Sequence, residues 1–381
     1  MKHKKQHILV LPINYPSDAN PIAGTFFKEQ VKAIASAGYK VGVLSFNALP
    51  LKKWSQCHSK IENSKGIIID QTCFPSLPKL ISVNHKIRTY FVKKKIKRYI
   101  NKNGHPDLIH VHVHSSAEAA IWAKQRFGIP YVITEHYSHF ANNQLNSYQL
   151  KYAKRAFQYA NERLCVSQSL GNTLTELFQL SFKCIPNILD PRFKLDNKLI
   201  SSTPYLLSVG SLSKVKNHQL LLKAFSRISQ ERPELNLIIA GEGPLKKDLI
   251  SLSHELGISK RVKFIGNKTK SELTKLMSGA IRFCLPSNYE TFGVVLIESM
   301  ACGTPVIATN VGGIPEIVDS SELGILCNDD VESYSMAILN SLSTSYDNSK
   351  ISYTTINNYG KESFLKKIEA VYSNLIVKTE P

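Results

Sequence analysis

The sequence predicts an α/β protein with two doubly wound, Rossmann-like domains that face each other across a cleft. Its 381 residues exceed the ~100 to 200 residues of one ordinary domain. Strand patterns alternate with helix patterns in both halves, and no repeat of roughly 20 to 50 residues replaces that alternation. Such alternation produces right-handed crossovers and parallel sheets, whose ligands bind beyond the carboxyl ends of the strands.

The first domain is expected over residues 1–190. Its basic start and the apolar run that follows imitate a secretory signal, but the run is short and no small-residue cleavage site follows. We therefore expect a first buried strand there, and no apolar run approaches the roughly 20 residues that span a membrane. The expected elements are strands over 7–13, 108–113 and 131–134, a turn and a strand within 38–45, a helix over 25–36, and a helix ending at Arg126 that a Ser115-x-x-Glu118 capping box opens.

The second domain is expected over residues 191–361, and a polar stretch up to Thr203 precedes its first strand. A last helix over 362–376, in the tail 362–381, has an apolar face that either domain could bury, for example by packing back on the N-terminal domain. The expected elements are strands over 205–209, 235–240, 262–265, 283–285 and 305–308, and helices over 218–228, 245–256, 270–278 and 292–302.

Positive charge is concentrated in the first half of the chain. The whole chain has 48 Lys and Arg against 29 Asp and Glu, and residues 1–190 have 26 against 10. This asymmetry predicts an anionic partner for the N-terminal domain. Residues 86–100 mix seven basic residues with aromatic and aliphatic ones, so this helix either lies on an anionic membrane surface or packs in the core with a solvated basic face.

The cysteines and histidines do not predict a metal site. Seven scattered cysteines, none in a C-x-x-C pair, indicate isolated thiols in a reducing compartment. His110, His112 and His114 alternate along a predicted strand and would share one face, where strand rise separates neighbours by ~6.6 Å. That spacing is too wide for three ligands of one ion.

The most specific pattern is a pair of glutamates that flank a helix start. The predicted strand ends at Leu285, Glu290 lies in the following loop, and a helix opens at about Phe292. The free backbone amides at the start of this helix would form an anion site suited to a phosphate. Glu298 would lie about two turns further, ~12 Å along the axis, so one extended ligand could reach both carboxylates.

This block resembles the donor site of the family 4 retaining glycosyltransferases (group 1), which have the GT-B fold. The Glu-x7-Glu pattern is followed by a helix and by Gly-Thr-Pro-Val-Ile-Ala at 303–308. The resemblance extends over nearly the whole chain. Further matching segments are 21–26, 106–112, 134–136, 209–217, 240–244, 262–266 and 312–316.

The resemblance implies a role for each matching residue. Glu298 would hold the ribose hydroxyls of a nucleotide sugar, and Glu290 would orient the donor sugar. Lys216 would neutralise the diphosphate and Gly24 would let the backbone approach it. The implied catalytic residues are Glu290 and His136, the latter contacting the sugar from the opposite wall of the cleft, and the implied donor-binding residues are Gly24, Lys216, Ser211, Phe292, Gly293 and Glu298.

Position 211 departs from the family pattern. The family commonly has Arg where this chain has Ser211, so Lys216 is left without its usual cationic companion. Lys214 could reach in instead, or Ser211 could donate a hydrogen bond, although neither reproduces a bidentate guanidinium contact. Each residue also has a purely structural interpretation: solvated carboxylates, a surface lysine, a turn glycine and a core histidine.

The implied function is transfer of a sugar, with retention of configuration and without a metal cofactor, from a nucleotide-diphosphate sugar to a lipid-linked or polysaccharide acceptor. Such a protein would work in cell-surface glycan synthesis, in the cytoplasm and peripherally at the inner face of the membrane. The alternative is a GT-B-fold nucleotide-sugar epimerase or hydrolase, which needs no acceptor. Only the pI of about 9.5 suggests nucleic-acid binding, and no recognition motif supports it.

Overall fold

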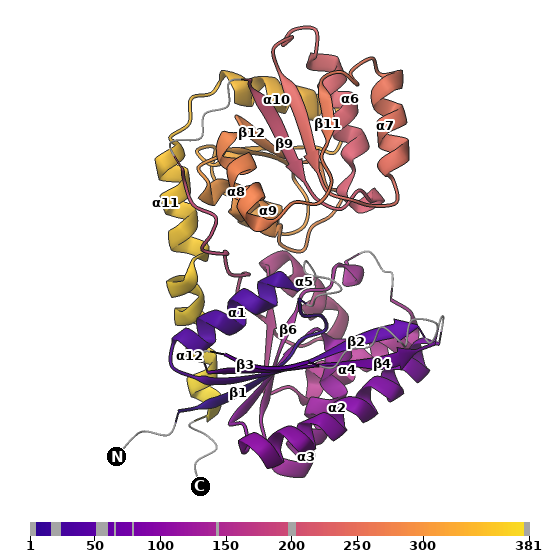
Figure 1. Ribbon diagram of the computed structural model, residues 1–381, viewed down its shortest axis with the longest axis vertical. Coiled ribbons are helices and arrows are strands. Elements are labelled where there is room, and N and C mark those ends of the chain that lie inside the picture. The colour runs from indigo at the N-terminus through magenta and orange to yellow at the C-terminus, as the bar shows by residue number, and fades with distance from the viewer. Residues whose placement is uncertain are drawn as a thin grey trace. The chain divides into compact units, whose positions relative to one another are not determined.

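The structure is a computed structural model that describes residues 5–16, 24–50, 60–64, 66–77, 80–141, 145–196 and 203–376. Cys57 and residues 21–23 of the predicted glycine loop lie outside the described residues. Contacts divide the chain into two compact units (Figure 1). Unit 1 comprises Met1–Ile188 with Phe364–Pro381, and unit 2 comprises Leu189–Ser363.

Unit 1 is built on one large sheet. Its described strands are β1 (His7–Leu11), β2 (Lys40–Pro50), β3 (Lys60–Ser64), β4 (Ile67–Ser76), β5 (Leu108–His112), β6 (Tyr131–Glu135), β7 (Glu162–Cys165) and β8 (Lys183–Cys184). Their order is β3-β4-β2-β1-β5-β6-β7-β8. All described pairings are parallel except β3 with β4. The antiparallel pair of β3 and β4 at this edge of the sheet was not predicted, because the sequence pattern indicated no strand at either segment.

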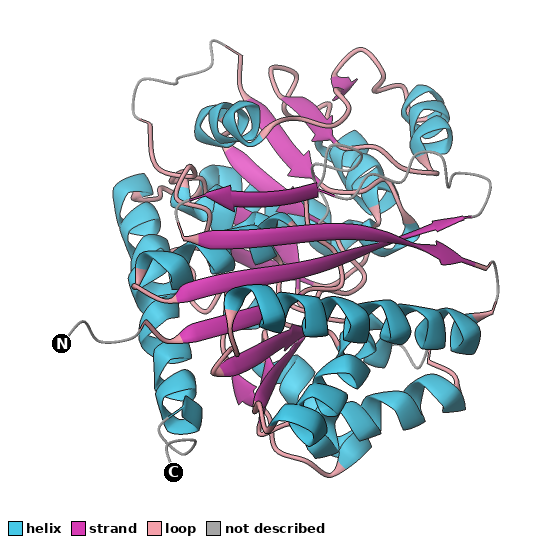
Figure 2. Cartoon of the chain, turned by 60° about the horizontal axis from the view of Figure 1, so that its bottom comes forward, coloured by secondary structure: helices cyan, strands magenta, loops and turns pink. Residues whose placement is uncertain are grey.

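Helices cover both faces of this sheet, as Figure 2 shows. The helices of unit 1 are α1 (Thr25–Ser36), α2 (Ile81–Asn103), α3 (Ala117–Phe127), α4 (Ser147–Tyr159), α5 (Gln168–Phe178) and α12 (Lys361–Ile376). In β2, Val41 and Val43 join a core with α1 and α12. Gly42 between them faces α2, where a Cβ would lie 2.1 Å from the Tyr99 hydroxyl. Alternate residues of one strand therefore contact helices on opposite faces.

The last helix, α12, completes the core of unit 1. Phe364, Ile368 and Tyr372 are buried against the β1 and β2 side chains and α1. The Tyr372 hydroxyl lies 2.6 Å from His110 Nδ1 in β5. Of the two arrangements open at the sequence level, the structure has α12 on the N-terminal unit.

Unit 2 contains a second, wholly parallel sheet. Its strands are β9 (Tyr205–Val209), β10 (Asn236–Ala240), β11 (Val262–Phe264), β12 (Arg282–Leu285), β13 (Val306–Thr309) and β14 (Gly324–Cys327), in the order β11-β10-β9-β12-β13-β14. Helices α6, α7 and α10 pack on one face. The helices of unit 2 are α6 (His218–Ile228), α7 (Lys246–Glu255), α8 (Lys270–Gly279), α9 (Val294–Ala301), α10 (Val331–Ser343) and α11 (Asn348–Tyr359). The doubly wound architecture predicted for both halves is confirmed.

Some local predictions in unit 1 are wrong. The strand expected over 7–13 ends at Leu11, and the strand expected to end at residue 45 continues to Pro50. The strand expected to reach residue 113 ends at His112, because Val113 has a φ of 70°, a left-handed conformation that a strand cannot contain. The capping box expected at Ser115 does not form. Helix α3 begins after Ser116 without a side-chain cap, and the Ser115 hydroxyl instead faces Arg88 of α2.

Two predictions about the whole chain can be compared with the described part. Within it, no disulfide bond joins two of the described cysteines. No helix among the described residues has the length and apolar character needed to cross a membrane.

Candidate active site

The candidate site of unit 2 lies where the strand order of its sheet reverses. The chain runs outward from β9 through β10 to β11, returns to β12 beside β9, and continues through β13 to β14. The register pairs Leu207 with Phe283, so the loops that follow β9 and β12 are neighbours. Such a reversal leaves a crevice beyond the carboxyl ends of the two central strands, where α/β sheets bind ligands.

An ion pair joins these two loops. The Lys216 amine, in the loop after β9, contacts the Glu290 carboxylate, in the loop after β12. The Ser287 hydroxyl also donates to that carboxylate at 2.9 Å. Both charged side chains are partly buried, with 23% of Lys216 and 12% of Glu290 exposed. Two residues predicted to serve one donor are therefore brought together, although each neutralises part of the other's charge.

Backbone contacts hold Glu290 in position. The Asn288 side chain donates to the Lys214 carbonyl at 3.1 Å, and its backbone N–H donates to the Val215 carbonyl at 2.8 Å. On the other side, the Gly313 N–H donates to the Glu290 carbonyl at 2.9 Å. Gly312 has a φ of 54°, and a Cβ there would lie 2.0 Å from the Glu290 carbonyl oxygen. The glycines after β13 thus allow the close approach that fixes the Glu290 backbone.

Glu298 occupies a more buried position in α9. Its side chain is 3% exposed and pairs with the Lys270 amine at the start of α8. Burial raises the pKa of the Glu298 carboxyl, while Lys270 acts in the opposite direction. Lys270 also lies 5.0 Å from the centre of the Phe193 ring. Because Glu298 is buried and paired, it is not a solvated surface carboxylate, which was the purely structural alternative for this residue.

The helix between the two glutamates is shorter than predicted. We expected it to begin at about Phe292, but α9 begins at Val294, and Gly293 precedes it with a φ of 95° that no helical residue adopts. Glu290 and Glu298 are therefore separated by a loop and one helical turn, not by two turns. Phe292 is buried and packs edge-on against Tyr359 at 5.7 Å, so a ligand could meet its backbone but not its ring.

Ser211 and Lys214 lie at the exposed edge of the loop after β9. The Ser211 hydroxyl is 3.1 Å from that of Ser213, and Lys214 is exposed. Next to Lys216, His218 is buried, and its Nδ1 has no partner within the described chain. Burial lowers the pKa of His218 to about 4, and the Lys216 charge adds to the effect. Lys216 and Lys214 are therefore the cations of this loop near pH 7.

In unit 1, Gly24 and His136 lie on neighbouring parts of one sheet edge. Gly24 has a φ of 69° and precedes α1, whose Phe26 and Phe27 rings each lie 5.2 Å from the His136 ring after β6. A Cβ at Gly24 would lie 2.5 Å from the Asn14 carbonyl oxygen. The turn itself therefore requires glycine, and the phosphate role of Gly24 stays a prediction.

His136 combines burial with an unused nitrogen. Its Nε2 lies 3.2 Å from His112 Nδ1, and its own Nδ1 is buried without a partner among the described residues. Burial lowers the pKa of His136 to about 4, so the ring is neutral near pH 7. A neutral imidazole can exchange a hydrogen bond with a sugar hydroxyl, but it supplies no positive charge.

The three alternating histidines do not share one face. His110 and His112 stack with ring centres 4.2 Å apart. His114 follows the Val113 turn and instead bonds Glu135 at 2.8 Å. Within the described ranges, no group of three His, Cys, Asp or Glu side chains could hold a metal ion.

Helix α2 is only partly the basic surface that its sequence indicated. Arg88 is buried and Lys95 pairs with Asp70 at 2.8 Å, so these two basic residues face the protein. Apolar Ile96 and Tyr99 are also buried. The basic residues of α2 that remain exposed are Lys86, Lys94, Lys97, Arg98 and Lys102, and Tyr90 beside them is 64% exposed.

Sequence patterns missed some residues that the structure brings to these sites. Ser287 and Asn288 lie in the same sequence segment as Glu290, so their closeness to Glu290 in the sequence could have identified them. Lys270, by contrast, is 28 residues from Glu298 and only the packing of α8 on α9 brings them together. Arg88 was assigned to a surface because its neighbours in sequence are basic.

Comparison with known families agrees with this arrangement. Residues 23–193 match the model of Glycosyltransferase Family 4, and residues 191–362 match that of Glycosyl transferases group 1. A glycogen synthase of Mycobacterium tuberculosis is 29% identical over 238 residues, which are 60% of this chain and 58% of the relative. The match thus spans little more than half of that relative's length.

Solved structures resemble the chain over nearly its full length. A sucrose-phosphate synthase from Thermosynechococcus elongatus has a TM-score of 0.83 at 22% identity, covering 98% of this chain and 100% of that one. HepE of Anabaena, solved with UDP, has a TM-score of 0.73 at 18% identity, covering 97% of this chain and 100% of that one. With its two doubly wound units and both family matches, the chain has the GT-B fold and belongs to the family 4, group 1 glycosyltransferases.

Proposed function

We propose that the protein transfers a sugar from a nucleotide-diphosphate sugar to an acceptor hydroxyl, and that unit 2 binds the donor. The observation that carries the proposal is the Lys216–Glu290 pair at the switch point of the unit 2 sheet, with buried Glu298 one helical turn into α9. The UDP in the solved HepE structure supports a nucleoside diphosphate as the leaving group.

The chemistry of the site suits a departing diphosphate. Negative charge grows on the phosphate as the glycosidic C–O bond breaks, so the site must stabilise an anion. Lys216 supplies a cation, and the backbone before α9 supplies amides at a helix N-terminus. Glu298 would accept hydrogen bonds from the ribose hydroxyls, and Glu290 would orient the sugar and stabilise positive charge at its anomeric carbon.

We further propose retention of configuration without a protein nucleophile and without a metal cofactor. In this proposal Lys216 and the backbone amides take the place of a divalent cation, and the acceptor attacks from the leaving-group side. The anomeric proton of the product, observed by NMR, would reveal inversion if this assignment were wrong. Donor binding that requires Mg²⁺ would contradict the metal-free proposal.

The acceptor that we propose is a lipid-linked or polysaccharide glycan of the cell envelope, reached from the cytoplasmic side. The exposed basic residues of α2 and the excess charge of residues 1–190 support contact with an anionic membrane surface. An epimerase or hydrolase would consume the nucleotide sugar without an acceptor. Donor consumption that depends on added acceptor therefore separates the two functions.

Charge reversal on α2 should release the protein from anionic vesicles. Each Lys or Arg near such a surface contributes about 1 kcal/mol, so changing Lys94, Lys97 and Arg98 to Glu should weaken binding more than about 100-fold. Sedimentation with phosphatidylglycerol vesicles measures this, with phosphatidylcholine vesicles as the neutral surface.

The matched control changes three exposed lysines of unit 2, Lys223, Lys247 and Lys260, to Glu. It alters net charge equally and should retain more binding than the α2 variant. Equal sedimentation of both variants would refute a membrane role for α2.

A further inference from the structure

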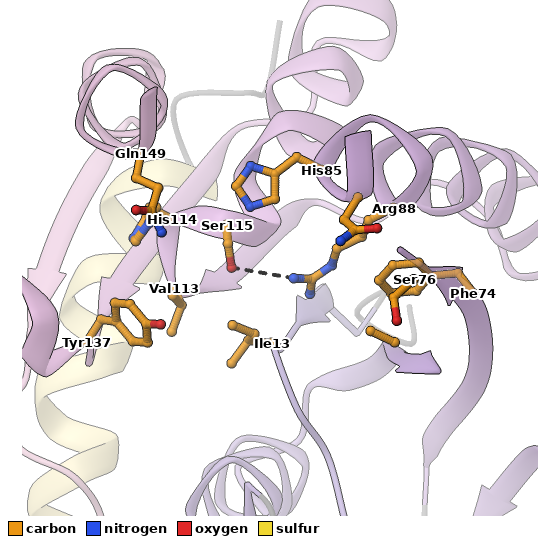
Figure 3. Close-up of a pocket in the computed structure, with 12 residues that line it drawn as sticks. Ile13, Phe74, Ser76, His85, Arg88, Val113, His114, Ser115, Tyr137 and Gln149 are labelled. Atoms are coloured by element: carbon orange, nitrogen blue, oxygen red, sulfur yellow. Dashed lines mark hydrogen bonds between the residues drawn. The ribbon is translucent and has the colours of Figure 1, made fainter. Parts of the chain in front are cut away.

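Unit 1 contains a cavity of about 210 Å³ at the carboxyl ends of its central strands (Figure 3). Ile13 follows β1, Ser115 follows β5 and Tyr137 follows β6, and all three line the cavity. His85 and Arg88 of α2 line another side. We call this cavity the Arg88 pocket. It occupies the position where doubly wound sheets bind ligands.

Arg88 is a buried cation with neutral partners. Its side chain reaches into the pocket, and the residue is 9% exposed. One guanidinium nitrogen donates to Ser116 Oγ at 2.8 Å, and another to Ser115 Oγ at 3.4 Å. A third contact, 3.5 Å long, reaches the Pro12 carbonyl, and Nε has no partner within the described chain. A buried charge normally has an opposite charge beside it, because desolvation is costly.

The remaining lining does not supply that charge. Among the described residues, no Asp or Glu lines the Arg88 pocket. The carboxylate of Glu135, which bonds His114 of the lining, also accepts the backbone N–H groups of His114, His136 and Tyr137. His85 adds a second buried nitrogen, Nδ1, without a partner in the part of the chain described. The Nε–H of Arg88 is therefore an unused donor on the cation of this pocket.

A second cavity also has His85 in its lining. It measures about 420 Å³, and three tyrosines, Tyr90, Tyr148 and Tyr152, line it together with the charged Lys86, Lys93 and Glu118. The His85 ring lies 4.6 Å from that of Tyr152. Aromatic faces accommodate the apolar faces of sugar rings and similar groups, so a molecule anchored at Arg88 would have a surface along which to continue.

We propose that the Arg88 pocket binds an acidic group of the acceptor, either a carboxylate or a phosphate. This inference rests on the proposed function, since a transferase whose donor occupies unit 2 needs a separate place for its acceptor. The guanidinium would hold the acid through its unpartnered Nε–H, in a charge-assisted hydrogen bond. An uncharged acceptor would leave Arg88 without a counter-charge.

The direct test is an NMR titration of the full chain with inorganic phosphate and, separately, acetate. The Arg88 Nε–H signal, assigned by its loss in Arg88→Lys, should shift and saturate with at least one anion. Exposed Arg126 provides the control signal, assigned by Arg126→Lys. An Arg88 signal that moves no more than that of Arg126 would overturn the proposal.

A second variant tests anion binding in the Arg88 pocket without changing Arg88 itself. Gln149 lines the pocket and caps α4 by accepting the Asn146 N–H at 3.0 Å. Glu performs the same capping role, so Gln149→Glu adds a negative charge to the lining while preserving the helix start. It should weaken anion binding at least tenfold, and unchanged binding would mean that the anion lies elsewhere.

Failure of this inference is distinguishable from failure of the proposed function. Donor nucleotide binding should be equal in Gln149→Glu and the unchanged protein, because the donor site belongs to unit 2. Loss of donor binding in Gln149→Glu would contradict that separation. Competition with phosphate by glycerol 3-phosphate indicates a soluble acceptor, and competition only by phosphatidic acid in vesicles indicates a lipid-borne one; both results support an acid site.

Discussion

Glu290→Ala should lower turnover by about 10²- to 10³-fold, the usual effect of removing one group that stabilises charge in a transition state. Donor affinity should change much less. The variant frees the Lys216 amine from its present partner, so the diphosphate keeps its cation and can gain from it. What is lost is the carboxylate that orients the sugar.

The measurement is a comparison of the maximal rate with the donor dissociation constant. Glu322→Ala is the matched control, because Glu322 forms an ion pair with Lys350 in the same unit, with both side chains more than half exposed. That variant should be active, since exposed pairs contribute little to stability. Equal losses of turnover and donor affinity in Glu290→Ala would contradict the role assigned to Glu290.

Glu298→Gln should weaken donor binding by roughly tenfold to a hundredfold, as expected when a hydrogen bond to a charged group loses about 1.5 to 3 kcal/mol. Gln keeps the shape of the side chain but accepts ribose hydroxyls less strongly. The variant also leaves Lys270 without its carboxylate, so its thermal unfolding must be measured beside its affinity.

A dideoxy ligand isolates the ribose contact from that structural effect. The unchanged protein should bind a nucleoside diphosphate more tightly than its 2′,3′-dideoxy analogue, whereas Glu298→Gln should discriminate little between them. Isothermal titration with both ligands measures the difference. If both proteins show the same preference for the ribose hydroxyls, Glu298 does not hold them.

The sequence was sufficient to predict the architecture and which segments lie together at the candidate site, for identifiable reasons. Strands such as 205–209 are short apolar runs followed by helical patterns. Such elements can be predicted because their pattern is local in the sequence and the folded chain has a strand at the same residues. Glu290 and Lys216 were recognised in separate motifs, and the neighbouring β9 and β12 bring them together. The Glu-x7-Glu spacing also selected Glu298, which the structure buries, and its ribose role stays a prediction.

Other features depend on information that a local pattern does not contain. The length of α9 was overestimated, because Gly293 has a positive φ that the surrounding apolar residues do not reveal. The burial of Arg88 follows from the way α2 packs near Ser116, 28 residues away in sequence. The partners Lys270 and Glu298 are likewise joined by packing between helices. Long-range contacts of this kind decide which charged residues face the protein.

In the proposed function, unit 2 binds a nucleoside diphosphate at Lys216 and Glu298. Thermal unfolding in the presence of UDP, GDP, ADP or CMP, each with Mg²⁺ or EDTA, tests it most directly. One diphosphate at 100 times its dissociation constant should stabilise the protein by ~2.7 kcal/mol, equally in Mg²⁺ and EDTA. That stabilisation should fall sharply in Lys216→Ala and persist in Lys223→Ala, an exposed residue of the same unit. No stabilisation by any nucleotide, or equal stabilisation of both variants, would contradict the account.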